Sequence, residues 1–374
     1  MKKKNKAIYL LFLMPFVYFA TACFVVWLVK TSGIYPSGSD TMYHVYRGDY
    51  VYNAIKSGNW YPLYDPAWYN GVEILRYWSP FPAYVMAFCQ YLAGGSQFGA
   101  YLFYIGGVCF LGACVWPFIG RGFNRPYMGA FIGLLWFFMP NNLCAIFIEG
   151  NLARSLSMIF LPVFIYSVYK YLYNHKLRYI PLMVFTFLLM ELCHLGYAGM
   201  VAIAVIIYGI VYMIQKGRKK AVLDVVISMI FGFMLLGIWL VASLRGGITS
   251  LDNSENMANF FQNLWITINP FERLTRGFEY FYFGFAALVV IVFGILFGYK
   301  KSRTGFVTGF IILLMTTKSA YAVLKHLPGS QYLWMLRFIS IALCMILMSF
   351  LMWDRLKKTL VLMLCVLLVV RSEE

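Results

Sequence analysis

The residues best suited to chemistry lie in one polar stretch between Lys30 and Pro82. Asp40, His44 and Arg47 follow one another at intervals of four and three residues, which would place them on one face of a helix. A carboxylate with an imidazole beside it can serve as a general base, provided that it reaches the proton it removes. An acidic residue at a helix start also has a simpler explanation, because it complements the helix dipole. Asp40 is therefore predicted to be either a catalytic base or a residue that stabilises the start of the helix.

The same stretch carries further ionisable side chains. Asp49 and Glu73 are alternative candidates for the general base, and Arg76 is a candidate phosphate contact. The stretch is also dense in Tyr and Trp, which membrane proteins use as an interfacial belt. Flat rings also stack on sugar faces, and the two roles are compatible. We expect an amphipathic helix from Ser39 to Ser57 that lies on the membrane and is ended by Gly58.

Polar groups later in the chain could hold a charged substrate. Glu149, Asn151 and Arg154 lie in a segment that looks like a helix start, with Asn151 as its cap and Arg154 as a candidate phosphate contact. Arg337 lies at one end of an apolar run, where its side chain could simply extend to the membrane surface. A guanidinium at this place is also well shaped to hold a lipid-linked phosphate through two hydrogen bonds.

Glu191 and His194 are three residues apart in an apolar segment, so we expect them to share one face of a helix. Ionisable groups at membrane depth are costly and usually face the protein interior, which leaves a structural pair and a functional pair both open. The 8 Cys residues lie in apolar segments without CxxC spacing. This distribution is typical of small core residues rather than of metal ligands or disulfides.

The composition indicates a membrane protein. Of the 374 residues, 62% are hydrophobic and only 12% are charged, which is roughly half the charged fraction of a soluble domain. Apolar runs of membrane-spanning length recur, and backbone inside lipid must be helical. We therefore predict an all-α polytopic membrane protein with one membrane domain over residues 1–374 and about 11 transmembrane helices. The expected spans are 7–29, 97–119, 126–147, 152–173, 179–195, 197–214, 221–243, 280–299, 304–317, 335–353 and 359–370.

The formal net charge of +17 could indicate a nucleic-acid partner, but the placement of the charges favours another explanation. With the N-terminus in the cytoplasm, most of the 31 Lys and Arg residues fall in the inner loops. The outer loops, about 30–95, 245–279 and 318–336, then hold balanced charges. This separation follows the positive-inside rule and excludes nucleic acid as a partner. The first apolar run is too long for a signal peptide, so we expect an uncleaved span in the cell membrane.

The first outer loop resembles that of bacterial GT-C-type membrane glycosyltransferases. It is most similar to the 6-pyruvoyl-tetrahydropterin synthase-related membrane proteins and the YfhO-like proteins. The likeness rests on a D-x-x-x-H-x-x-R pattern followed by G-x-x-x-P, a Trp, an N-G pair and Y-x-x-P-x-P. These positions are Asp40, His44, Arg47, Gly58, Pro62, Trp68, Asn70, Gly71, Tyr77, Pro80 and Pro82. Two weaker matches are His194 at the outer end of a span and the Arg337–Phe338 pair near the C-terminal spans.

The resemblance implies a GT-C-like bundle that transfers a sugar from a polyprenyl-phosphate donor to an acceptor, such as a cell-envelope saccharide, at the outer face of the membrane. The candidate catalytic residues are Asp40, His44 and Asp49. The candidate substrate-binding residues are Arg47, Glu73, Arg76, Glu149, Arg154, His194 and Arg337. We expect no cofactor and no required metal ion, because arginines can balance a monophosphate leaving group. The alternative is a transporter or flippase for lipid-linked saccharides, or a non-catalytic subunit, which would need the phosphate contact but no positioned base.

Overall fold

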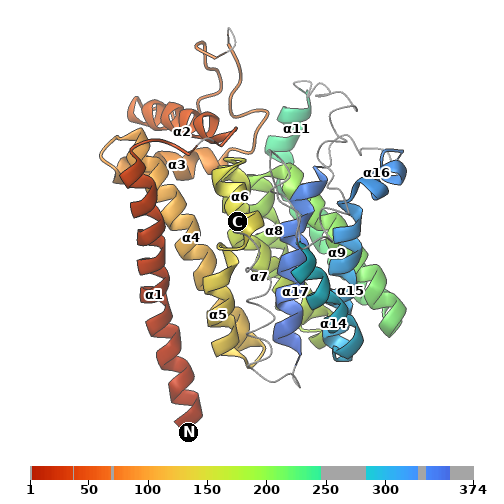
Figure 1. Ribbon diagram of the computed structural model, residues 1–374. Helices are drawn as coiled ribbons and strands as arrows, with labels where there is room; N and C mark the ends of the chain where they lie inside the picture. The colour runs from red at the N-terminus through yellow and green to blue at the C-terminus, as the bar shows by residue number, and fades with distance from the viewer. Residues whose placement is uncertain (1, 37, 69–70, 246–283, 327–333, 354–374) are drawn as a thin grey trace.

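The computed structural model describes residues 2–36, 38–68, 71–245, 284–326 and 334–353. Within these residues the regular structure is helical, which confirms the predicted all-α membrane protein (Figure 1). The helices are α1 (Lys2–Ser32), α2 (Thr41–Lys56), α3 (Phe81–Leu92), α4 (Gln97–Gly122), α5 (Pro126–Trp136), α6 (Pro140–Phe147), α7 (Leu152–Asn174), α8 (Tyr179–Cys193), α9 (Leu195–Lys216), α10 (Lys219–Leu235), α11 (Gly237–Arg245), α14 (Gly284–Phe297), α15 (Lys300–Met315), α16 (Lys318–Leu324), the 3₁₀ turn η4 (Met335–Arg337) and α17 (Phe338–Met352).

Five of the described helices are long and apolar enough to cross a membrane. Two bent pairs raise this number to 7 if each pair is one span: α5 with α6, bent by 44°, and α10 with α11, bent by 65°. Shorter apolar helices lie at Tyr179–Cys193 and Ala287–Phe297. The predicted number of about 11 spans is therefore not confirmed, because the predicted spans 179–195 and 280–299 correspond to these shorter helices and two further predicted spans match neither the candidate spans nor the shorter helices. The span 359–370 lies outside the described residues, and 304–317 falls in α15, which begins with Lys300, Lys301 and Arg303.

The centre of the bundle is formed by α7 and α17. Their most apolar windows are 83% and 94% buried, whereas that of α1 is only 22% buried. Figure 1 shows α1 at one edge of the bundle, beside α4. Buried helices in lipid pack through small side chains that let backbones approach closely. Gly305 of α15 illustrates this, because a Cβ atom there would lie 1.9 Å from the Ser349 hydroxyl of α17.

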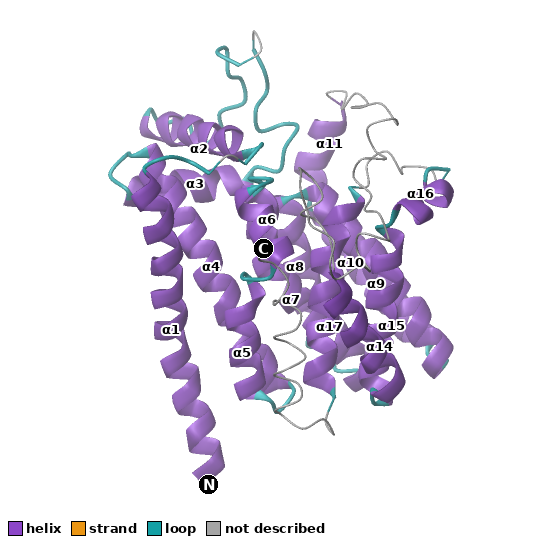
Figure 2. Ribbon diagram, viewed as in Figure 1, coloured by secondary structure: helices purple, strands orange, loops and turns teal. Residues whose placement is uncertain are grey.

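The helices α2 and α3 run across one end of the bundle instead of through it (Figure 2). The expected helix Ser39–Ser57 is present as α2, and Gly58 ends it with a φ of +87°, a conformation that glycine adopts without strain. Gly48 allows α2 to pack closely on α3, since a Cβ atom there would lie 2.2 Å from Met86 Cγ. This packing buries the face of α2 that carries ionisable groups, because the bundle lies beneath it.

Candidate functional site

The segment between α1 and α3, which the sequence predicts to be the first outer loop, is joined to the α6–α7 connection by hydrogen bonds. The Asp40 amide donates to the Glu149 carbonyl at 3.0 Å, and the Ser39 hydroxyl donates to the same carbonyl at 2.9 Å. Gly38 and Gly150 make this close approach possible, because a Cβ atom on Gly38 would lie 2.6 Å from Gly150 Cα. Asp40 is therefore fixed beside Glu149 although more than a hundred residues separate them.

Asn151 organises the start of α7 as the sequence predicts. Its side-chain oxygen accepts a hydrogen bond from the Arg154 amide at 2.9 Å, which is the expected helix cap. The side-chain nitrogen of Asn151 donates to Glu149 Oε1 at 3.1 Å. One short polar residue thus caps the helix that carries Arg154 and orients the carboxylate of Glu149.

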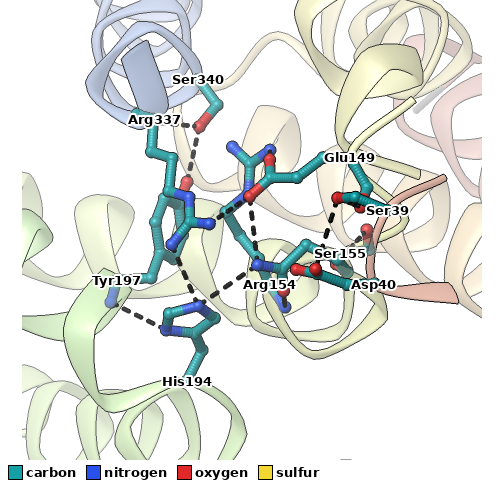
Figure 3. Close-up of polar contacts among 10 residues, drawn as sticks. Ser39, Asp40, Glu149, Arg154, Ser155, His194, Tyr197, Arg337 and Ser340 are labelled. Atoms are coloured by element: carbon teal, nitrogen blue, oxygen red, sulfur yellow. Dashed lines mark hydrogen bonds and ion pairs between the residues drawn. The ribbon is translucent and has the colours of Figure 1, made fainter. Parts of the chain in front are cut away.

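Four ionisable side chains meet above α7, and we call them the arginine cluster: Glu149, Arg154, His194 and Arg337 (Figure 3). Glu149 forms ion pairs with both Arg154 and Arg337. The three side chains are 7%, 0% and 11% exposed, so little water screens the pairs. Burial raises the pKa of Glu149, but Arg154 and Arg337 outweigh burial and bring the pKa below its ordinary value. Glu149 is therefore an anion at neutral pH.

His194 is held as a neutral imidazole with a defined tautomer. Its Nδ1 accepts the Tyr197 amide hydrogen at 3.1 Å and so caps α9. Burial, followed by the charges of Arg337 and Arg154, lowers the pKa of His194 to about 3. In the neutral ring the proton must then be on Nε2. That nitrogen lies 3.4 Å from Asn151 Nδ2 and 3.5 Å from Arg337 Nη1, which are themselves donors.

The arginine cluster has more hydrogen-bond donors than acceptors. Within the described structure, Arg154 Nε, Arg154 Nη1 and Arg337 Nε are buried without a hydrogen-bond partner. The Nε2–H of His194 also faces nitrogen donors. A buried unpaired donor costs free energy, and a bound water or anion is one of the groups that can satisfy it. The cluster therefore has the chemistry to bind a phosphate group.

Asp40 lies at the N-cap of α2, yet its side chain makes no capping hydrogen bond. The half-buried carboxylate accepts a hydrogen bond from the Ser39 hydroxyl at 3.3 Å. Burial raises its pKa, and the nearby charge of Glu149 raises it further, while Arg337, Ser39 and Arg154 lower it. The net direction is upward, which moves this carboxyl toward the range useful to a general base. The Asp40 side chain makes no capping hydrogen bond, but its place at the start of α2 fits the interaction with the helix dipole, so both explanations stay predictions.

His44 and Arg47 lie in the buried face of α2. Burial and the charge of Arg47 lower the pKa of His44 to about 3, so the imidazole is uncharged near the arginine cluster. Arg47 is 2% exposed and donates to the carbonyls of Trp78 and Ser79 at 3.2 and 3.4 Å. These contacts give Arg47 a structural position in which it fastens the end of the first outer loop.

Three other predicted residues lie apart from the arginine cluster. Asp49 accepts a hydrogen bond from Gln90 Nε2 of α3 at 2.6 Å. Glu73 and Arg76 pair with each other, and Arg76 Nε also donates to the Ala242 carbonyl of α11 at 2.9 Å. Among the described residues, no group of three or more His, Cys, Asp or Glu side chains is arranged to hold a metal ion.

The prediction that Glu191 and His194 share a helix face is wrong. α8 ends at Cys193, and His194 is extended, with φ of −157° and ψ of 94°, which turns its ring away from the α8 surface. Sequence reasoning also missed Ser79, whose hydroxyl donates to the Glu191 carbonyl at 2.8 Å and accepts from the Leu195 amide at 3.3 Å. Ser79 thus joins the first outer loop to the turn that carries His194, and its place in a serine–proline pair gave no signal of this.

A sequence model described as the 6-pyruvoyl-tetrahydropterin synthase related domain, a membrane protein, matches residues 75–373. The matched region contains the whole arginine cluster, whereas Asp40 lies before it. No curated protein and no solved structure matches the chain.

Proposed function

The chain belongs to the family of membrane proteins with the 6-pyruvoyl-tetrahydropterin synthase related domain, and from this premise we propose that it is a membrane glycosyltransferase. The donor is a sugar linked to polyprenyl phosphate. The acceptor is a hydroxyl of a cell-envelope saccharide at the outer face of the cell membrane. The observation that carries the proposal is the arginine cluster, whose unpaired hydrogen-bond donors lie near the carboxylate of Asp40. This carboxylate is not used in a capping hydrogen bond of α2.

The charge of the arginine cluster suits this donor. Arg154 and Arg337 carry two positive charges and Glu149 carries one negative charge, while His44 and His194 are uncharged. Within the cluster this leaves one positive charge, which the nearby carboxylate of Asp40 offsets as long as it is ionised. Buried charges are stable only when they are paired. A phosphodiester with one negative charge therefore brings less unpaired charge into the site than a sugar diphosphate, which carries two negative charges.

The reaction is a single displacement with inversion at the anomeric carbon. Asp40 takes the proton from the acceptor hydroxyl, whose oxygen forms a bond to the anomeric carbon. The bond from that carbon to the phosphate oxygen breaks, and polyprenyl phosphate leaves with one more negative charge. Arg154, Arg337 and the Nε2–H of His194 stabilise that charge. Because Asp40 becomes neutral as the phosphate gains charge, the total charge of the site and its substrates stays constant.

The proposal is tested by incubating purified protein with a panel of radiolabelled polyprenyl-phosphate sugars and measuring release of polyprenyl phosphate. We expect release from one donor of the panel, and we expect Arg337→Gln to reduce it by roughly 10²–10³-fold, as for loss of a donor to a developing oxyanion. Binding of these donors without release in the presence of acceptor saccharides would favour the transporter or non-catalytic subunit. Failure to bind any member of the panel would contradict both functions.

A further inference from the structure

Trp78 is an exposed aromatic residue that directly precedes Ser79, which is hydrogen-bonded to the turn that carries His194 of the arginine cluster. It is 43% exposed. The next residue, Ser79, is hydrogen-bonded to the Glu191 carbonyl and the Leu195 amide on either side of His194. The backbone of Trp78 is therefore fixed to the turn that carries the imidazole of the cluster.

The ring of Trp78 is also held from the protein side. The Arg47 guanidinium lies 5.8 Å from the ring centroid, and the Tyr43 ring packs edge-on at 5.1 Å. Arg47 also donates to the Trp78 carbonyl, and Tyr43 contacts the His44 ring at 5.6 Å. A buried cation and an aromatic neighbour thus fix the orientation of the indole while much of its surface stays open.

Other exposed aromatic residues of the same loop lack this connection. Trp60 is 71% exposed and Tyr64 is 58% exposed. Their backbones are held by the hydroxyls of Tyr84 and Tyr50, at 2.7 and 2.5 Å, on the side of the loop that faces α2 and α3. An anchor in the interfacial belt needs an apolar body and a polar tip, but it needs no fixed position relative to a phosphate site. Trp78 combines exposure with such a position.

We propose that Trp78, supported by Tyr43, forms the stacking surface for a neutral pyranose ring next to the phosphate site. The apolar C–H face of a pyranose would pack on the indole, and its hydroxyls would remain free for polar groups or water. This inference rests on the proposed function, because it assumes that the molecule bound beside the arginine cluster is a saccharide. It assigns a sugar-binding role to Trp78, which is not among the Asp, Glu, His and Arg residues that the sequence analysis proposed for catalysis and substrate binding.

The test uses saturation-transfer difference NMR on the full chain in lipid nanodiscs, prepared without any glycosidic detergent. The probes are methyl α- and β-D-glucopyranoside, galactopyranoside and mannopyranoside. We expect the wild-type protein to bind at least one probe. Trp78→Leu, which keeps apolar bulk but loses the flat ring, should weaken binding about tenfold, the worth of one aromatic contact. Trp78→Phe should retain most of the binding, and Trp60→Leu is the matched control that should not change it.

The outcomes separate this inference from the proposed function. Equal binding by wild type and Trp78→Leu, or no binding of any probe by the wild type, would overturn the stacking surface even if donor turnover is found. Loss of binding in Trp78→Leu alone would support the stacking surface even if no donor is turned over. Equal losses in Trp78→Leu and Trp60→Leu would show a general effect of aromatic residues in the loop and would also overturn the specific role of Trp78.

Discussion

Glu149 provides the negative charge that makes burial of two arginines possible. With Arg154 fully buried and Arg337 11% exposed, removal of this carboxylate leaves two cations with little access to water. Breaking a buried ion pair by removing one partner costs about 3–5 kcal/mol. We therefore expect Glu149→Gln to lower the thermal unfolding midpoint of the protein in nanodiscs substantially.

Glu73→Gln is the matched control for Glu149→Gln. It removes the same charge from the ion pair between Glu73 and Arg76. The side chain of Glu73 is 34% exposed and that of Arg76 is 27% exposed. Such exposed pairs contribute about 0–1 kcal/mol, so the midpoint should hardly move. Equal shifts in both variants would contradict the account of the cluster. Because the pKa of Glu149 is below its ordinary value, its contribution is present at neutral pH and is lost as the pH falls through that pKa.

The proposed role of Asp40 as general base predicts how turnover changes with pH. A general base acts in its ionised form, so kcat/KM should rise with pH through the pKa of Asp40. Burial and Glu149 raise that pKa, so the midpoint should lie above the usual range for aspartate. His44 and His194, with pKa values of about 3, should add no inflection between pH 5 and 8. A midpoint within the ordinary range, or a flat profile, would contradict this role of Asp40.

At the scale of single residues, the sequence identifies local roles better than partners. The Asn151 cap is confirmed because it depends on residues within one turn of α7. The grouping of Glu191 with His194 failed because the end of α8 falls between them. The catalytic and binding roles assigned to the site residues stay predictions, since geometry places a group without demonstrating turnover.

At the scale of elements, the sequence predicts both ends of α2 to within two residues. It does not predict which face of α2 is turned toward the helix bundle. The sequence suggests that His44 and Arg47 share a polar face, and such a face is normally turned to water. In the structure this face is turned inward, and Met42 is 56% exposed. Only tertiary contacts could show this, because Arg47 is satisfied by carbonyls that lie about thirty residues away in the sequence.

Arg47 gives a prediction about how α2 holds the end of the first outer loop. Arg47→Ala removes the two hydrogen bonds to the Trp78 and Ser79 carbonyls and leaves a cavity in a fully buried place. We expect faster hydrogen–deuterium exchange in peptides that cover 76–82 and 192–197, because Ser79 connects these segments. Lys56→Ala, at the exposed end of α2, is the control and should leave both peptides unchanged. Protection that is unaltered by Arg47→Ala would show that other contacts hold the loop.

At the scale of the whole molecule, the arginine cluster assembles residues from the α6–α7 connection, the start of α7, the α8–α9 connection and η4. The sequence places each group at the same predicted membrane face through the charge pattern, but it cannot give the distances between them. The number of spans shows the same limit. Apolar runs are visible in the sequence, whereas the angles of the bends that divide two of them, 44° and 65°, are known only from the structure.

The orientation of the molecule is a prediction that labelling can check. A cysteine introduced by Ser57→Cys, in the exposed end of α2, should react with a membrane-impermeant maleimide in intact cells. A cysteine introduced by Lys219→Cys, in the exposed start of α10, should react only after the membrane is opened. The unsubstituted protein serves as the background, since it has Cys residues of its own. The reverse labelling pattern would overturn the outward orientation and with it the proposed function.

The central claim is that Asp40 is the general base and that the arginine cluster binds the donor. Asp40→Asn keeps the shape of the side chain and is about as good a helix cap, but it cannot accept the proton. Because burial raises the pKa of Asp40, its charge does not stabilise the fold at neutral pH, so the variant should unfold at the same or a higher temperature.

The most direct measurement compares wild type and Asp40→Asn for donor binding and for single-turnover release of polyprenyl phosphate from the same radiolabelled donor. Asp49→Asn is the internal control. Asp49 lies away from the arginine cluster, where it accepts a hydrogen bond from Gln90 of α3. The account predicts unchanged donor binding in all three proteins and a release rate that falls by roughly 10²–10⁴-fold only in Asp40→Asn. Release at the wild-type rate by Asp40→Asn, or a comparable loss in Asp49→Asn alone, would contradict it.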